Sequence, residues 1–261
     1  MGKDYKQNMA FSSMEKRGQL AIFVIVAIAI VAIILVIFLF PRLDLAVNDV
    51  NPSSFLRECM RDDLQASLLT LTRQGGSLEP DNYILYQGEQ IQYLCYTDTP
   101  YLPCKVQQPL LIDHVQDEIK SYMEPRARQC VTDLANEYES RGFDVQARQG
   151  EINVEIVPRQ IIVEFNSPMT VSKDDSSQTF QKFSIGTESE LYDLLSIATN
   201  IVQFESTLGD SETLLYIQYY PNLKIDKINR DEGNTIYLLS DITTGDSFTF
   251  ASKSQAWPPG E

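Results

Sequence analysis

The hydrophobic and polar positions along this chain divide it into one long apolar run and a longer segment with shorter periodic patterns. Residues 20–40 form a run of 21 positions without a charged or polar side chain. A helix of this length spans about 31 Å, which matches the hydrocarbon core of a bilayer. Since a helix pairs every backbone amide within the lipid, we predict a transmembrane helix over 19–41.

The patterns predict six segments. In chain order these are a basic cytoplasmic tail or leader at 1–18, the transmembrane helix at 19–41, a spacer at 42–54, a helix-rich cysteine-bearing subdomain at 55–148, an α+β subdomain at 149–252 and a flexible tail at 253–261.

The first subdomain has helical periodicity. Apolar residues recur at steps of three and four over 55–73, which predicts an amphipathic helix capped by Ser53 or Ser54. Two tyrosine-rich strands are expected next, over 83–87 and 90–96. A short helix marked by Val115, Ile119 and Tyr122 should follow, and then a second helix that opens at Pro125, because proline suits the first helical turn.

The second subdomain changes to a period of two. Apolar and polar residues alternate over 152–156 and again over 161–165, which predicts a hairpin with one buried face. A helix capped by Thr187 or Ser189 is expected after a strand at 180–185. Further strands are predicted at 214–220, 223–228, 236–239 and 247–251. The expected fold is therefore α+β: a transmembrane helix, a helical cysteine-bearing part, and a mainly antiparallel sheet with a packed helix.

The charges orient the chain. The whole chain has a net charge of −15, whereas residues 1–18 carry four basic and two acidic side chains. Basic residues close to a membrane segment stay on the cytoplasmic side. We therefore expect a cell-membrane protein with a cytoplasmic N-terminus and an extracytoplasmic C-terminal domain. The run is too long for a cleaved secretory signal and lacks a small-residue cleavage site.

All four cysteines follow the apolar run, in the part expected to be oxidising. Four cysteines allow three pairings. We favour Cys59 with Cys130, because each lies at or near the apolar stripe of a predicted helix. That choice leaves Cys95 with Cys104, which are close enough in sequence to close a hairpin-like loop.

The sequence offers little chemistry. It contains no Gly-x-Ser-x-Gly elbow, no phosphate-binding glycine loop, no His-Glu-x-x-His and no dinucleotide fingerprint. His114 is the only histidine, and we interpret it as a surface residue. The acidic pairs lack the spacing of a calcium loop. We therefore expect no enzyme, no catalytic, cofactor-binding or metal-binding residues, and, given the acidity, no nucleic-acid partner.

Tyrosine is the most frequent aromatic residue. Tyr83, Tyr86, Tyr93, Tyr96 and Tyr101 lie close together in sequence, and Tyr216, Tyr219 and Tyr220 form a second group. Tyrosine is enriched at protein interfaces, but it is also an ordinary strand residue. Both interpretations stay open.

Lys16-Arg17-Gly18-Gln19, directly before the apolar run, resembles the class III signal peptide of archaeal type IV pilin-like proteins. The resemblance is confined to the N-terminal segment. It implies that a membrane peptidase cuts between Gly18 and Gln19 and that the freed helix packs into a filament core. Ala21 and Phe23 stand where that family often has serine and glutamate. The overall layout also resembles uncharacterised single-pass membrane proteins of small-genome archaea, which implies no activity.

Two functions are therefore considered. The first is a single-pass membrane-anchored envelope protein whose ectodomain binds or scaffolds other surface components. The alternative is a processed type IV pilin-like subunit of a surface filament or assembly machine. The expected partners are the lipid bilayer and other envelope or membrane proteins, and an oligomer is compatible with both functions.

Overall fold

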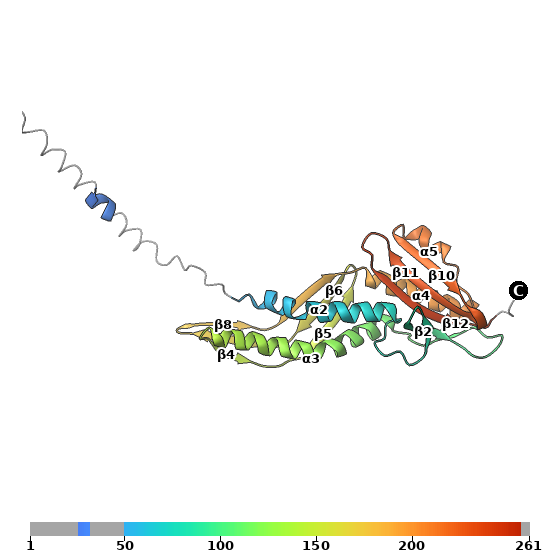
Figure 1. Ribbon diagram of the computed structural model, residues 1–261, viewed down its shortest axis with the longest axis horizontal. Coiled ribbons are helices and arrows are strands. Elements are labelled where there is room, and N and C mark those ends of the chain that lie inside the picture. Colours follow the sequence, from blue (N-terminus) through green and yellow to red (C-terminus); the bar gives the residue numbers. More distant parts are fainter. Residues whose placement is uncertain (1–25, 32–49, 257–261) are drawn as a thin grey trace, which may run out of the picture. The chain divides into compact units, whose positions relative to one another are not determined.

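The computed structural model describes residues 26–31 and 50–256, and the chain divides into two units, Met1–Asp49 and Val50–Glu261 (Figure 1). In the first unit residues 26–31 are helical. The rest of the predicted transmembrane helix, the basic tail and the Gly18–Gln19 bond lie outside the described residues. Within the described parts of the chain, no helix has both the length and the apolar character needed to cross a membrane.

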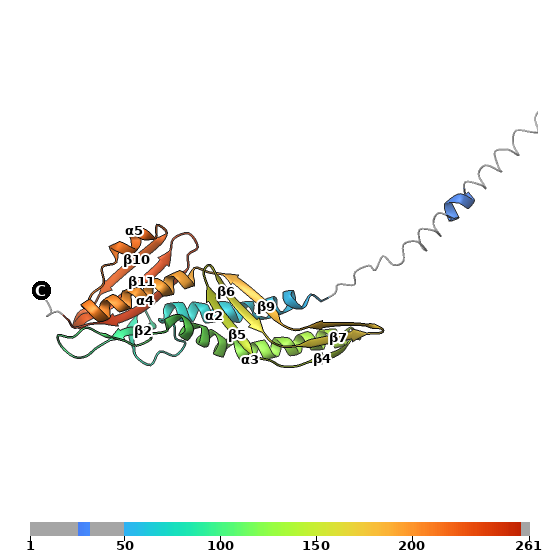
Figure 2. The same cartoon turned by 180° about the vertical axis from the view of Figure 1, so that it is seen from behind.

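Two long helices, α2 (Pro52–Arg73) and α3 (Leu111–Ser140), lie side by side in the second unit (Figures 1 and 2). Helix α2 begins earlier than predicted, and its cap is Asn51 rather than Ser53 or Ser54. The Asn51 side-chain oxygen accepts hydrogen bonds from the backbone N–H groups of both serines. Asparagine is among the strongest N-cap residues, which explains the earlier start.

Helix α3 corrects the prediction of two helices, because it continues through Pro125. Proline inside a helix costs about 3 kcal/mol, since its ring removes one backbone hydrogen bond and crowds the preceding turn. The buried stripe of α3 nevertheless runs unbroken across this point, from Ile119 and Met123 to Ala127 and Cys130. Packing of this stripe outweighs the local penalty.

Both disulfides have the favoured pairing. Cys59–Cys130 joins α2 to α3, and Cys95–Cys104 closes the loop after strand β2. There are no free cysteines.

Within residues 50–256 the strands form three sheets, and their pairing is antiparallel except between β12 and β2. The largest has the order β1 (Tyr83–Tyr86), β2 (Glu89–Tyr96), β12 (Ser247–Lys253), β11 (Asn234–Asp241), β10 (Leu223–Asn229), with β3 (Lys105–Val106) also paired to β2. A second contains β4 (Asp144–Ala147), β7 (Met169–Lys173) and β8 (Ser176–Phe180), and a third contains β5 (Ile152–Val157), β6 (Gln160–Phe165) and β9 (Phe183–Glu188). The parallel pair joins strands from both sides of the boundary predicted at 148/149.

One strand prediction was misplaced and another was wrong. The strand expected at 180–185 is split between β8 and β9, which belong to different sheets. The strand expected at 214–220 is the short helix α5 (Leu214–Tyr219), whose first N–H is held by the Glu212 carboxylate at 3.1 Å. Apolar composition favoured a strand there, but the segment forms a short helix beside β10 instead.

The main core lies between the helices and the sheets. Helix α4 (Leu191–Leu208) packs on one face of the largest sheet, and α3 packs on β5 and β4. A one-turn 3-10 helix, Asp231–Gly233, connects β10 to β11. The observed fold is thus α+β with mainly antiparallel sheets and a packed helix, as the sequence predicts.

Candidate functional site

The largest sheet has two different faces. Helix α4 lies against one of them, as Figure 2 shows, while the opposite face is turned toward the viewer in Figure 1. That opposite face carries a second apolar cluster, separate from the main core, which we name the tyrosine face. Its residues all come from strands: Ile84, Tyr86, Ile91, Tyr93, Tyr96, Ile228, Ile236, Leu238 and Ala251. Four of these are buried, and the other five are partly exposed.

A shift in strand register creates the tyrosine pair at the centre of this face. Tyr93 and Tyr96 are three residues apart, so a regular strand would point them to opposite sides. The pairing between β2 and β12 shifts between Ala251 and Ser252, and such an irregularity redirects side chains. The two rings pack edge to face with their centroids 5.0 Å apart.

Hydrogen bonds fix both tyrosine rings. The Tyr93 hydroxyl donates to Asn234 Oδ1 at 2.7 Å, and the Tyr96 hydroxyl donates to Asp98 Oδ2 at 2.5 Å. Lys253 Nζ lies 2.6 Å from Asp98 Oδ1 and 5.4 Å from the centroid of the Tyr96 ring. Rings held in this way lose little further freedom when a partner binds, which favours affinity.

The electrostatics of this pair follow from the same contacts. Burial raises the pKa of Tyr93 above its ordinary value. The hydrogen bond to Asp98 raises the pKa of Tyr96, and the hydrogen bond from Lys253 lowers the pKa of Asp98. Both tyrosines therefore stay neutral at physiological pH; Tyr93 is buried beneath the face, and the partly exposed Tyr96 contributes an apolar ring beside a polar margin.

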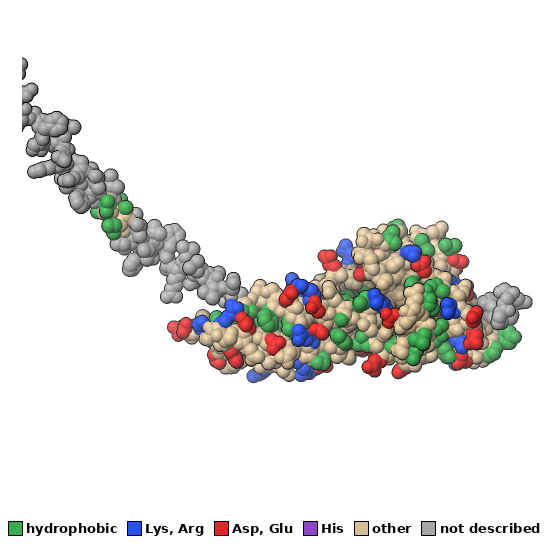
Figure 3. Space-filling model, in the orientation of Figure 1, with side chains coloured by type: hydrophobic (Ala, Val, Ile, Leu, Met, Phe, Trp, Pro, Cys, Tyr) green, Lys and Arg blue, Asp and Glu red, His purple; other side chains and the backbone are tan. Residues whose placement is uncertain are grey.

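The loop closed by Cys95–Cys104 extends the apolar surface beyond the sheet. Tyr101 at its tip is 70% exposed and Leu102 is 49% exposed. The Leu102 carbonyl oxygen accepts a hydrogen bond from the backbone N–H of Gln255, which ties the loop to the segment after β12. In the space-filling view, hydrophobic side chains gather over this end of the domain (Figure 3).

The second tyrosine group lies elsewhere, on and just after α5. Tyr219 is 81% exposed and Tyr220 is 47% exposed, whereas Tyr216 packs against the main core. Helix α5 also exposes Leu214 and Leu215. The sequence therefore contains two separate tyrosine surfaces, of which only the first has its rings fixed by stacking and hydrogen bonds.

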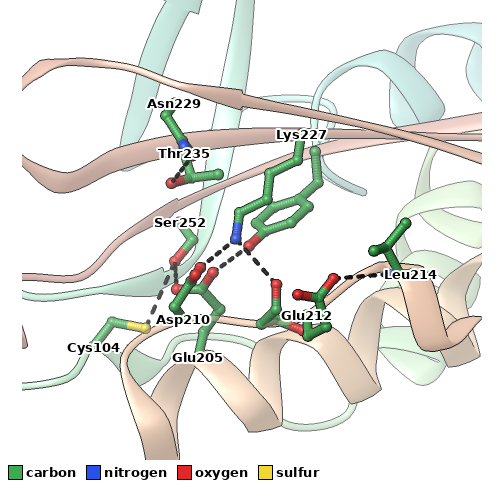
Figure 4. Close-up of polar contacts among 11 residues, drawn as sticks. Cys104, Glu205, Asp210, Glu212, Leu214, Lys227, Asn229, Thr235 and Ser252 are labelled. Atoms are coloured by element: carbon green, nitrogen blue, oxygen red, sulfur yellow. Dashed lines mark hydrogen bonds and ion pairs between the residues drawn. The ribbon is translucent and has the colours of Figure 1, made fainter.

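Figure 4 shows a buried carboxylate between α4 and the sheet. Glu205 is 2% exposed; its Oε1 accepts from the Tyr237 hydroxyl, and its Oε2 accepts from the Ser252 hydroxyl at 3.1 Å. Burial raises the pKa of Glu205 above its ordinary value. Lys227 Nζ nearby contacts Asp210 and the Ser211 carbonyl oxygen. Because the carboxylate is enclosed, it is suited to fastening α4 to the sheet rather than to contacting a substrate.

Shallow hollows surround the first turn of α4. Their linings combine acidic side chains with polar and apolar ones and with Arg159. Among the acidic residues, Asp246 has a structural role, because its Oδ2 accepts from Ser189 Oγ at 3.0 Å and from the Glu190 backbone N–H at 2.6 Å. Burial, together with the neighbouring carboxylates, raises the pKa of Glu190. In the part of the chain that the structure describes, no group of histidine, cysteine and acidic side chains could hold a metal ion.

The other residues considered from the sequence are dispersed. His114 Nε2 lies 2.8 Å from Ser77 Oγ, in a contact between α3 and the segment after α2. Glu58 forms an ion pair with Arg61, and Asp63 pairs with Arg126 across the two long helices. These side chains therefore make separate structural contacts and do not converge on one site.

Comparison with known proteins assigns this chain to no family. Neither a protein family model, nor a curated protein, nor a solved structure matches this chain.

Proposed function

We propose that this chain is a single-pass membrane-anchored envelope protein whose extracytoplasmic domain binds other surface proteins through the tyrosine face. In this proposal the bilayer and the bound proteins are its partners, and the domain is a binding module rather than an enzyme. One observation carries the proposal: this apolar sheet face holds packed tyrosine rings, and all of its residues lie in strands.

The anchoring part rests on the sequence and on the cysteines. The apolar run at 20–40 has the length of a bilayer-spanning helix, and basic residues precede it. The two disulfides support an oxidising, extracytoplasmic location for the domain that follows, because disulfides are rare in reducing compartments.

The binding part rests on the chemistry of the tyrosine face. Interface centres are enriched in aromatic residues and depleted of charge. Tyr86, Tyr96 and Leu238 are partly exposed on this face, and Lys253 and Asp98 form a charged margin beside it. The tyrosine face is therefore suited to bind a partner surface of matching shape that has an apolar centre and a polar rim.

A photo-crosslinking residue at Leu238 in the full chain, expressed in its native membrane, tests the binding proposal. We expect crosslinks to other envelope proteins from position 238. The matched control is the same residue at Tyr219, which is highly exposed but belongs to the other surface. Equal crosslinking at both positions, or none at 238, would contradict the proposal.

Treating intact cells with a membrane-impermeant protease tests the location. We expect the folded domain to be accessible from outside and the tail that contains Lys16 and Arg17 to be protected. Protection of the domain in intact cells and its digestion after lysis would reverse the proposed orientation.

The alternative function is a processed type IV pilin-like subunit. The observation that favours it is Lys16-Arg17-Gly18-Gln19 directly before the apolar run. Mass spectrometry of the native N-terminus distinguishes the two. A chain that begins at Gln19 would support the pilin-like function, and an intact Lys16-Arg17 pair would exclude it.

A further inference from the structure

Strand β1 is an open edge of the largest sheet. Among the described residues β1 pairs only with β2. The backbone N–H of Tyr93 donates to the Asn82 carbonyl oxygen at 2.9 Å, so Asn82, Ile84 and Tyr86 direct their peptide groups toward β2. The peptide groups of Tyr83 and Leu85 consequently point away from the sheet.

Within residues 82–88 this edge lacks the charged and proline residues that commonly protect against strand pairing. Natural edge strands are commonly blunted by charged residues or proline. Residues 82–88 contain neither, although the chain as a whole carries a net charge of −15. The opposite edge is different: β10 carries Lys224, Asp226 and Lys227, and α5 lies beside it.

The outward peptide groups are symmetric about one residue. Tyr83 and Leu85 lie on either side of Ile84, so an antiparallel copy of the same strand can pair with β1 around a two-fold axis through Ile84. Tyr83 then exchanges two hydrogen bonds with Leu85 of the copy, and Leu85 exchanges two with Tyr83 of the copy. The two Ile84 residues face each other in a non-hydrogen-bonded pair, and no like charges are opposed within the strand.

We propose that two copies of this chain associate edge to edge through β1, forming one continuous sheet with the two tyrosine faces on the same side. A two-fold axis perpendicular to the sheet keeps each residue on its own face, so Ile84 and Tyr86 of both copies extend one apolar surface. Leu85, which is 65% exposed in one copy, gains Tyr83 of the other copy as its neighbour. The dimer makes a second copy of this chain one of its partners, which goes beyond the proposed function.

The length of the strand sets the strength of the association. Stable protein interfaces bury about 1,200–2,000 Å² in total, and a four-residue edge provides less than that. The dimer should therefore be weak for dilute chains and should form where copies are concentrated, since confinement raises the effective concentration.

Cysteine crosslinking of the full chain in lipid vesicles tests this geometry. Opposed residues of a non-hydrogen-bonded pair have Cα atoms about 4.5 Å apart, within the range that a disulfide spans. Ile84→Cys should therefore form a covalent dimer under mild oxidation, several-fold more than Leu85→Cys, which is offset from its own copy, or Lys224→Cys on the opposite edge. Equal dimer fractions for the three variants would overturn the proposal, as would crosslinking of Ile84→Cys only to a different protein in native membranes.

A second variant and a measurement on the wild-type chain guard against misfolding of Ile84→Cys. Leu85→Pro removes only an outward N–H and no bond to β2, so it should abolish the Ile84→Cys dimer while the fold persists. In the wild-type chain, hydrogen exchange of a peptide covering 82–86 should slow as the number of chains per vesicle rises. Exchange that does not depend on chain density would overturn the dimer. By contrast, a failure of position 238 to crosslink to other envelope proteins would contradict the proposed function and leave the dimer untouched.

Discussion

Cys130 on α3 is bonded to Cys59 on α2 across a separation of 71 residues, and it lies just beyond the proline that interrupts the α3 backbone ladder. The disulfide therefore holds the second half of α3 against α2 at the point where the helix is locally weakest. The Cys95–Cys104 bond spans only 9 residues and fastens a loop to the end of the sheet.

This difference in span predicts a difference in stability. In the chain-entropy description, cross-linking a longer segment restricts the unfolded chain more. Replacing both Cys59 and Cys130 by alanine should lower the free energy of unfolding by about 4 kcal/mol, and the same change at Cys95 and Cys104 by about 2.5 kcal/mol. Urea unfolding of a fragment that begins at Val50 measures both. A larger loss for the Cys95/Cys104 pair would contradict the entropic explanation.

Pro125 should be replaceable with a gain in stability. Its ring is exposed, and proline in a helix interior costs about 3 kcal/mol. Pro125→Ala restores the missing N–H within α3, so we expect the free energy of unfolding to rise by about 1–3 kcal/mol. Lys120→Ala, earlier in the same helix, is the control and should change it by less than about 0.5 kcal/mol. A loss of stability in Pro125→Ala would show that the proline relieves a strain in α3.

The sequence predicted those parts of the fold that depend on local patterns. The alternation of Ile152, Val154 and Ile156 with polar residues correctly predicted a hairpin with one buried face. Placing each of Cys59 and Cys130 at or near an apolar stripe also led to the correct disulfide. The prediction failed at Pro125. The preference of proline for the start of a helix was outweighed by the burial of apolar residues on both sides of it, which keeps α3 continuous.

The tyrosine face could be predicted only in part. The spacing of the first tyrosine group suggested an interface, but Tyr93 and Tyr96 share a face only because the register shifts against Ala251 and Ser252. Ile236 and Leu238 complete the face from β11, more than a hundred residues later in the chain. Such pairings depend on the tertiary fold, and no local pattern encodes them. Strand β8 was missed because its residues are mostly polar and none is buried, and β7 was missed because its alternation contains only two buried residues, Met169 and Val171.

Glu205 should give the domain a characteristic pH dependence. Its pKa is raised in the folded state by burial, so the folded protein binds this proton more tightly than the unfolded chain does. Its contribution to stability is fully present below the unfolded pKa and is lost as the pH rises through the folded pKa. Relative to Glu205→Gln, the wild-type domain should therefore gain stability as the pH falls from neutral toward the ordinary pKa of glutamate.

Thermal unfolding across this pH range measures the effect as the difference between wild type and variant. Glu58→Gln is the matched control, because Glu58 is an exposed carboxylate paired with Arg61. Glu58→Gln should therefore keep the pH dependence of the wild type, unlike Glu205→Gln. Lowering the pH also reduces the repulsion among the many carboxylates, but this affects all three proteins alike. If the wild type and Glu205→Gln follow parallel curves, the buried carboxylate has no shifted titration.

Gly150, in the loop before β5, and Gly186, in β9, offer a matched test of close packing. A Cβ at Gly150 would lie 1.4 Å from the Asn166 carbonyl oxygen, a backbone atom directly after β6, whose own N–H donates to the Glu151 carbonyl oxygen. A Cβ at Gly186 would instead meet the end of the flexible Gln160 side chain at 2.3 Å. Gly150→Ala should therefore lower the free energy of unfolding by about 3 kcal/mol or more, since overpacking forces the backbone to shift. Gly186→Ala should cost less than about 1 kcal/mol, because Gln160 can adopt another rotamer. Urea unfolding of the fragment from Val50 compares the two variants, and equal losses would mean that the close approach at Gly150 relaxes without displacing the backbone at Asn166.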